Sequence, residues 1–292
     1  GPGRVNLTPM LLQSGKLNGD LTVACIDEET FYLFGSSVAQ NMHLRWFEMH
    51  LEGVQDVVYQ NMTDDFHGIA ISGPNSRELL SRLTREDVSS ETFKFRDIRD
   101  TFIGGVPALC TRISFTGELG YEIYVAPQYQ LKLFEAIEEL GVDLNLKWFG
   151  GRALMSMRLE KSWGAWTMDF RPDFTIMESG LDFFVDWDKD FIGKKAALIE
   201  KNNGPSKKLS VIQIDTETDV SGDEAVMHNG ECVSYITSGG YGHSVKKSLA
   251  MTYLPVELID SNVRLEVEIL GKFYKASIVM EPLYDPSGSK MR

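Results

Sequence analysis

The sequence predicts an α+β protein that ends in an all-β unit, and three observations carry this prediction. Up to about residue 203, strand-like runs alternate with segments whose apolar residues recur at helical spacing. From Leu209 onward, short strand-like runs are joined by Asn-Gly, Gly-Gly and Leu-Gly turns. No apolar run approaches the roughly 20 residues of a membrane span.

The first part of the chain alternates β and α patterns. "DLTVACI" (residues 20–26) and "FYLFGSS" (31–37) are strand-like and are separated by an acidic turn. Residues 37–51 place apolar side chains at helical spacing, and His43 lies within this stripe. "VVYQNMT" (57–63) and "HGIAISGP" (67–74) then predict two short strands.

Further helices and a strand pair follow. Asn75 or Ser76 is a suitable N-cap for a helix over "SRELLSRLT". "VPALCTRISFTGELGYEIYVAP" (106–127) predicts two strands, and "QYQLKLFEAIEELG" an amphipathic helix that ends at Gly141. "GGRALMSMRLEKSW" and "FIGKKAALIEKNNG" predict two more helices.

The linker "GPSKK" separates these elements from the β-rich remainder, which is typical of a small barrel or sandwich. We therefore expect two domains, residues 1–203 and residues 204–292, with a boundary near Gly204.

Charge and composition narrow the function classes. The chain has 42 acidic and 29 basic residues, a net charge of −13, which argues against a nucleic-acid partner. The three cysteines, at positions 25, 110 and 232, are far apart and predict buried thiols in a reducing compartment. The five histidines form no zinc-type spacing, so we expect no metal site. The sequence predicts a soluble protein with no membrane partner.

The stretch "RISFTGELGYEIYVAP" interrupts a strand pattern with two glycines and then places Glu122 between an aromatic and an apolar residue. One interpretation is a wide hairpin whose Glu122 faces solvent, as most charged strand residues do. The other is that Glu122 faces a pocket together with Phe115 and Tyr124. A carboxylate beside aromatic rings suits a flat, amine-rich heterocycle, because it accepts parallel N–H bonds while the rings stack.

Three other motifs each allow two interpretations. In "MRLEKSWGAW", Glu160 and Trp163 share a helix face, which indicates either a site or a solvated helix end. His43 is either a packed histidine or a proton-transfer group. "SGGYGHSVKK" is closer to a glycine-rich hairpin tip than to a phosphate-binding loop, although Lys246 and Lys247 could meet an anionic ligand tail.

Six motifs occur together and in order: "RISFTGELGYEIY", "LMSMRLEKSWGAW", "MESGLDFFV", "DFIGKKAAL", "TSGGYGHSVKKSLAMTYLP" and "LEVEILGKFYKASIVMEP". On these motifs the chain resembles the glycine-cleavage aminomethyltransferase (T-protein) superfamily over nearly its whole length. Within it, the chain is most similar to the C-terminal, folate-binding portion of the dimethylglycine and sarcosine dehydrogenase-like enzymes.

The resemblance implies a fold and a site. The implied fold is a ring-like folate-binding domain of T-protein type followed by a C-terminal β-barrel. Glu122 would reach the pterin of tetrahydrofolate across a central cavity. The other residues that match the lining of this pocket are Asp20, Leu21, Thr22, Phe115, Ile123, Tyr124 and Phe183.

The implied chemistry is the capture of a one-carbon unit. A flavin domain oxidises an N-methyl amine, and the carbon reaches tetrahydrofolate to give 5,10-methylenetetrahydrofolate. No GxGxxG motif lies near the N-terminus, so FAD is expected only in an upstream domain that this chain lacks. The resemblance thus implies a truncated segment from the bacterial cytoplasm or the mitochondrial matrix.

Two departures bear on this assignment. The family's catalytic aspartate aligns near His43, which makes His43 the candidate catalytic residue at that position. Glycine-cleavage enzymes have an arginine where this chain has Leu154, whereas Arg152 is typical of sarcosine dehydrogenase-like sequences. These departures favour the amine-dehydrogenase branch over a glycine-cleavage aminomethyltransferase. They also leave open a non-catalytic or regulatory module that keeps the fold.

Overall fold

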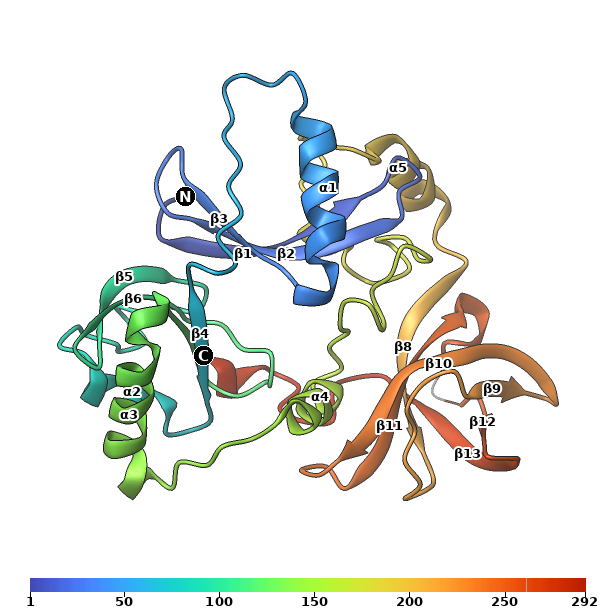
Figure 1. The fold of residues 1–292 in the computed structure, drawn as a ribbon. Coiled ribbons are helices and arrows are strands. Elements are labelled where there is room, and N and C mark those ends of the chain that lie inside the picture. The colour runs from blue at the N-terminus through green and yellow to red at the C-terminus, as the bar shows by residue number, and fades with distance from the viewer. Residues whose placement is uncertain (261) are drawn as a thin grey trace. The chain divides into compact units, whose positions relative to one another are not determined.

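The computed structural model describes residues 1–260 and 262–292, which form two compact units. Unit 1 comprises Gly1–Asn6, Thr22–Phe149 and Gly288–Arg292, and unit 2 comprises Leu7–Leu21 and Gly150–Ser287. Figure 1 follows the chain through both units by colour. Each unit has apolar clusters of its own, so each can be understood from its own packing.

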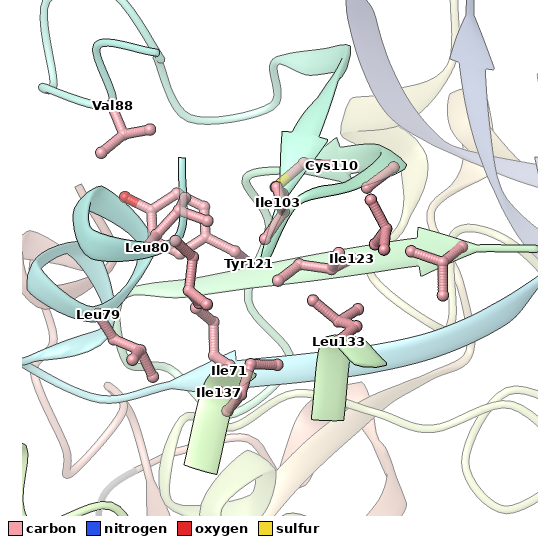
Figure 2. Packing of buried hydrophobic residues seen from close by; sticks show 14 of the residues in the cluster. Ile71, Leu79, Leu80, Val88, Ile103, Cys110, Tyr121, Ile123, Leu133 and Ile137 are labelled. Atoms are coloured by element: carbon pink, nitrogen blue, oxygen red, sulfur yellow. The ribbon is translucent and has the colours of Figure 1, made fainter. Parts of the chain in front are cut away.

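An antiparallel sheet with the order β4-β7-β6-β5 forms the centre of unit 1. Its strands are β4 (His67–Ser72), β5 (Ile98–Ile103), β6 (Val106–Thr111) and β7 (Gly120–Val125). The helices α2 (Ser76–Leu83) and α3 (Gln130–Gly141) pack their apolar stripes on one face of this sheet. Figure 2 shows the resulting core, in which Leu80, Leu133 and Ile137 from the helices meet Tyr121 and Ile123 from β7.

The other face of the same sheet meets the N-terminal strands. These are β1 (Arg4–Leu11), β2 (Leu17–Cys25) and β3 (Phe31–Phe34), which pair in that order. Within unit 1, Val5 and Ala24 pack with Ile98 and Leu109 in a second apolar cluster. The helix α1 (Gln40–Leu51) follows β3. Within unit 1, apolar side chains therefore pack on both faces of this sheet.

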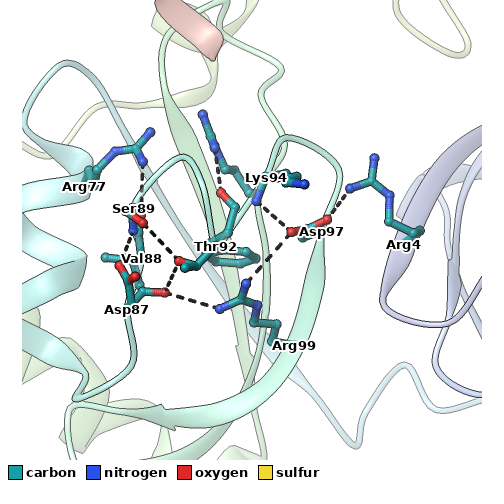
Figure 3. Close-up of polar contacts among 11 residues, drawn as sticks. Arg4, Arg77, Asp87, Val88, Ser89, Thr92, Lys94, Asp97 and Arg99 are labelled. Atoms are coloured by element: carbon teal, nitrogen blue, oxygen red, sulfur yellow. Dashed lines mark hydrogen bonds and ion pairs between the residues drawn. The ribbon is translucent and has the colours of Figure 1, made fainter.

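Polar contacts fasten the loop that precedes β5 (Figure 3). Asp97 forms an ion pair with Arg4 and accepts the backbone N–H of Lys94 at 2.6 Å. The carbonyl oxygen of Asp87 accepts hydrogen bonds from Thr92 Oγ1 at 2.9 Å and from Arg99 Nη1 at 3.3 Å. Through its ion pair with Arg4, Asp97 joins the N-terminal strand to the start of β5.

Unit 2 consists of two helices and a closed barrel. The helices are α4 (Gly151–Glu160) and α5 (Lys194–Asn203). The barrel strands are β8 (Lys207–Ile214), β9 (Ala225–His228), β10 (Glu231–Gly242), β11 (Lys247–Pro255), β12 (Leu265–Ile269) and β13 (Lys272–Val279). They close in the order β10-β11-β8-β13-β12-β9, so the β-rich segment is a barrel and not a sandwich. Alternate residues such as Ile212, Val226 and Val267 fill its interior.

Short 3₁₀ helices connect several of these elements. They are η1 (Ser37–Ala39), η2 (Pro127–Tyr129), η3 (Val142–Leu144), η4 (Asp182–Phe184), η5 (Val256–Leu258) and η6 (Ser289–Met291). No helix among the described residues is long and apolar enough to span a bilayer.

Most predicted elements are confirmed, and the exceptions are one predicted strand, two strands that were not predicted and the burial of one thiol. Residues 57–63 form no strand, since Val58 is almost fully exposed and no burial stabilises an extended run there. The strands β1 and β5 were not predicted, because polar residues break their apolar pattern and they gain stability only from their neighbours. Of the thiols expected to be buried, Cys110 is buried, whereas Cys232 is exposed.

The compact units do not follow the expected domain boundary, because residues 150–203 associate with the barrel. Gly204 ends α5 with φ 80°, where glycine is favoured. A boundary near Gly204 stays a prediction. Limited proteolysis tests it: first cleavage between Asn202 and Lys208 would support it, and first cleavage inside α3 would contradict it.

Candidate functional site

The strand β7 separates its side chains onto two faces. Tyr121, Ile123 and Val125 enter the core beneath α2 and α3. Glu122 and Tyr124 alternate with them and lie on the opposite face, since successive side chains of a strand point to opposite sides. Ile123, expected to line the folate pocket, is fully buried in that core, and its place in the pocket stays a prediction.

Glu122 is half-buried and accepts a hydrogen bond from the hydroxyl of Tyr124. Burial raises the pKa of Glu122 above its usual range, because low polarity disfavours the charged carboxylate, and the Tyr124 hydrogen bond opposes this effect. Burial also raises the pKa of Tyr124. Glu122 therefore does not point into free solvent, and the solvent-facing interpretation of this strand was wrong.

An aromatic pair lies beside this carboxylate. The ring of Phe34 in β3 is 4.6 Å from the ring of Tyr124, at an interplanar angle of 31°. A Cβ at Gly68 would approach that ring to 3.2 Å, so the absence of a side chain in β4 leaves room for it. Sequence reasoning missed Phe34 and Gly68, although both lie in predicted strands. Neither strand pattern alone shows which residue of β7 it will face.

The two glycines of the interrupted strand have separate structural reasons. Gly117 has φ 84°, a conformation that favours glycine. A Cβ at Gly120 would lie 2.9 Å from the carbonyl oxygen of Ile113, so the chain can fold back closely there. Directly before Gly117, Thr116 Oγ1 hydrogen-bonds Ser72 Oγ at 2.6 Å. These contacts fix the loop that carries the half-buried Phe115.

The strand β2 carries the wall segment predicted at residues 20–22. Thr22 pairs with Phe34, which places it one strand away from the ring that contacts Tyr124. Asp20 lies two residues earlier, on the same face of β2. Burial raises the pKa of Asp20 from 3.8 to about 6. Leu21 is buried. The structure thus brings Thr22, Glu122 and Tyr124 together in unit 1 through Phe34.

His43 is 4% exposed and lies in the first half of α1. Two aromatic residues of the same helix contact other rings: the ring of Trp46 lies 4.0 Å from that of His50, and the ring of Phe47 lies 5.2 Å from that of Tyr59. The burial of His43 agrees with a packing role in α1. Phe183, expected on the far side of the pocket, is 69% exposed in η4, and its ring lies 4.1 Å from that of Phe184 at an interplanar angle of 35°.

The "RLE" motif has a structural role in unit 2. Glu160 is 2% exposed, and its Oε1 accepts the backbone N–H groups of Ser244 and Val245 at 2.6 and 3.1 Å. These residues form the tip of the β10–β11 hairpin, which confirms the hairpin prediction for this glycine-rich segment. A Cβ at Gly242 would lie 2.9 Å from Glu160 Cγ, so glycine permits this close approach. The interpretation as a solvated helix end was wrong.

The same helix carries a buried ion pair. Arg158 Nη1 lies 2.6 Å from Asp169 Oδ2, and both side chains are almost fully buried. The described residues contain no group of three or more His, Cys, Asp or Glu side chains able to hold a metal ion.

Comparison with known proteins gives matches along nearly the whole chain. Residues 1–189 match the GCVT N-terminal domain, and residues 207–285 match the glycine cleavage T-protein C-terminal barrel domain. The chain is 37% identical over 285 residues to mitochondrial dimethylglycine dehydrogenase of Homo sapiens, covering 96% of this chain. It is 31% identical over 290 residues to an aminomethyltransferase of Thermoanaerobacter sp. (strain X514), covering 98% of this chain and 78% of that protein.

The chain spans only 33% of the length of that dimethylglycine dehydrogenase. A solved structure, the glycine cleavage system aminomethyltransferase T of Bartonella henselae, matches with a TM-score of 0.85 at 22% identity. This match covers 98% of our chain and 77% of that structure and supports the same fold, an α+β domain followed by a barrel. The chain therefore belongs to the glycine cleavage T-protein family, and it is homologous to the T-protein-like region of dimethylglycine dehydrogenase.

Proposed function

We propose that this chain binds tetrahydrofolate at the face of β7 that carries Glu122, and that it serves in one-carbon transfer from an N-methyl amine. The observation that carries the proposal is the half-buried Glu122 carboxylate beside the ring of Tyr124. Membership of the aminomethyltransferase family supports the same ligand class.

The residues of this face fit a pterin. Burial raises the pKa of Glu122, so the carboxylate lacks the hydration that would stabilise its charge. A ligand that donates two N–H groups restores this stabilisation, and charge-assisted hydrogen bonds of this kind are strong. Tyr124 orients the carboxylate through its hydroxyl and, with Phe34, presents aromatic surface for a flat ring. Thr22 and Phe115 are the remaining wall residues in unit 1 that the proposal assigns to the ligand.

Bound tetrahydrofolate supplies the nitrogen nucleophile that takes up the one-carbon unit. The protein contributes orientation and proton transfer. For the proton we propose Asp20 in place of His43. A carboxyl whose pKa is about 6 can exchange a proton near neutral pH, and Asp20 belongs to the wall segment that the resemblance assigns to the pocket. An imidazolium at His43 would repel a positively charged iminium, whereas a carboxylate would attract it.

The N-methyl amine branch is the more specific part of the proposal. Its support is the 37% identity to dimethylglycine dehydrogenase, compared with 31% for the aminomethyltransferase. In this branch, a flavin-binding portion carrying FAD would oxidise the amine, as in a dimethylglycine or sarcosine dehydrogenase. Arg152 supports the branch only weakly, because it is 96% exposed and lies 3.7 Å from Asp219 at the surface.

A second candidate is a non-catalytic or regulatory module that retains the fold. The observation that favours it is the buried His43 at the position where the family's aspartate was expected. Such a module would bind folate without passing on a one-carbon unit. Measuring 5,10-methylenetetrahydrofolate formed per amine oxidised, in the dehydrogenase in which this chain is proposed to act, separates the two candidates.

Isothermal titration calorimetry with tetrahydrofolate tests the site directly. Glu122→Gln keeps the shape of the side chain but removes its charge. It should weaken binding by about 1.5–3 kcal/mol, the usual range for a hydrogen bond to a charged group. Glu135→Gln, on the exposed side of α3, is the matched control and should leave the affinity unchanged. Unaltered affinity in Glu122→Gln would place the ligand elsewhere.

A further inference from the structure

We propose that a cavity in unit 2 is a second small-molecule site, and that it takes a small methylated ammonium cation. The cavity measures about 310 Å³ and is lined by residues of the turn after α4, of the 179–181 segment and of strands β8, β11 and β13. None of its lining residues belongs to the set predicted for folate. Its volume is at the lower end of those found for ligand pockets.

The aromatic part of the lining suits a methylated cation. Trp163 and Phe170 both line the cavity, and their rings meet edge to face at 6.2 Å and 81°. Met251 and Met280 contribute polarisable thioethers. Quaternary ammonium groups bind over aromatic faces through cation–π attraction, and a tryptophan ring is the strongest partner for them. The apolar methyl groups of such a ligand also gain from leaving water.

The charge of the lining also favours a cationic ligand. Glu281 is the one charged residue among the described residues that line the cavity, and no Lys, Arg or His stands among them. Glu281 is exposed and has no ion-pair partner within the described part of the chain. A carboxylate in the lining attracts a cation and disfavours an anion, so the charge of the lining favours a cationic ligand.

The inner wall is held in place before any ligand arrives. Ser179 Oγ, which lines the cavity, hydrogen-bonds the hydroxyl of Tyr253 at 2.8 Å. The same hydroxyl donates to the carbonyl oxygen of Asp169 at 2.9 Å. Arg158 Nη1 lies 3.2 Å from Met251 Sδ, but its charge is balanced by Asp169, so it does not repel a cation in the cavity. Binding to a preformed wall costs little ordering entropy.

Choline is the probe, and 3,3-dimethylbutan-1-ol is its uncharged counterpart of the same shape. Both are titrated by calorimetry into the full 292-residue chain. Since cation–π attraction contributes about 0.5–2 kcal/mol, choline should bind roughly three- to thirty-fold more tightly than the alcohol. Equal binding of the two would overturn the assignment to a cation. If neither compound binds at 10 mM, which is on the order of the weakest relevant affinity, the proposal that this cavity is a ligand site is wrong.

Two variants locate the bound cation. Glu281→Gln is at an exposed position, so the chain should fold normally, and choline affinity should fall about two- to five-fold at low salt, as for a partly exposed charge pair. Trp163→Leu should weaken choline about three- to thirty-fold, whereas Trp163→Phe should keep part of the affinity. Glu257→Gln, an exposed carboxylate in η5 outside the lining, is the control. Choline binding that none of the first three variants alters would overturn the location.

Discussion

The carboxylate of Asp169 in unit 2 is fully buried and that of Glu122 in unit 1 is half-buried, and the two differ in the hydrogen bonds that they accept. Asp169 accepts four hydrogen bonds, from Arg158 Nη1, the backbone N–H of Ala165, Thr237 Oγ1 and Ser238 Oγ, at 2.5–2.9 Å. In the described part of the chain, Glu122 accepts one, from Tyr124.

The difference separates a structural charge from one suited to binding. A buried carboxylate whose oxygens all have donors has nothing left to offer a ligand, and it fixes the elements that supply those donors. Asp169 thereby ties the chain after α4 to β10. Glu122 keeps acceptor capacity that a ligand can use, and burial raises its pKa because the protein itself does not fully compensate its charge.

The largest effect is expected at Asp169. Asp169→Asn leaves the buried Arg158 without its counter-charge, which typically costs about 3–5 kcal/mol. Urea denaturation followed by tryptophan fluorescence should show this loss in the free energy of unfolding. Asp173→Asn removes an exposed partner of Arg171 and should change stability by less than about 0.5 kcal/mol. Similar losses in the free energy of unfolding for Asp169→Asn and Asp173→Asn would contradict the structural role of Asp169.

Asp20 should make stability depend on pH. Its folded pKa of about 6 exceeds the usual 3.8, so the folded chain retains a proton that the unfolded chain loses. Between about pH 4 and pH 6, stability should therefore fall as pH rises, by at most about 3 kcal/mol, and the cost should stay constant above pH 6. Asp20→Asn removes this titration. Relative to the wild type, the variant should become more stable as the pH rises from 4 to 6. Denaturation midpoints measured from pH 4 to pH 8 check this change. A difference in stability between the two proteins that stays constant over this pH range would contradict a raised pKa of Asp20 in the folded chain.

Tyr124→Phe tests how the Tyr124 hydroxyl acts on the Glu122 carboxylate. The Tyr124 hydroxyl lowers the pKa of Glu122 against the raising effect of burial, so its removal should raise that pKa further. Carboxyl NMR titration measures the change. The tetrahydrofolate affinity should fall by about 0.5–1.5 kcal/mol, the usual net contribution of one hydrogen bond. An unchanged Glu122 titration would mean that the hydroxyl does not orient this carboxylate. Tyr129→Phe, on η2, is the matched control.

The smallest effect on one-carbon transfer is expected at His43. If Asp20 handles the proton, His43→Ala should leave the ratio of methylenetetrahydrofolate formed to amine oxidised unchanged, and only stability should fall, because a buried side chain is lost. A lower ratio, with free formaldehyde released, would transfer the catalytic role to His43. His50→Ala, near the exposed end of α1, controls for general effects on the helix.

Much of the site could be predicted from local sequence. The alternation in β7 and the two glycines before it predicted that Glu122 and Tyr124 would lie together on a bent strand, and the structure shows their hydrogen bond. The same alternation sends Ile123 to the opposite face, into the core beneath α2 and α3, so its place in the folate pocket stays a prediction. Phe34 could not be predicted as the partner of Tyr124, since the two residues lie 90 positions apart in the chain.

The sequence by itself determined the α+β class, most of the helices and strands, and the β-rich C-terminal segment. These follow from the periodicity of apolar residues and from turn residues, which act over a few positions. Only the tertiary structure decided that the β-rich segment closes into a barrel, that Asp169 neutralises Arg158, and that Asp20 has a pKa of about 6. Ring closure, ion pairing and desolvation depend on residues far apart in the chain coming together, and no local pattern encodes the distance between them.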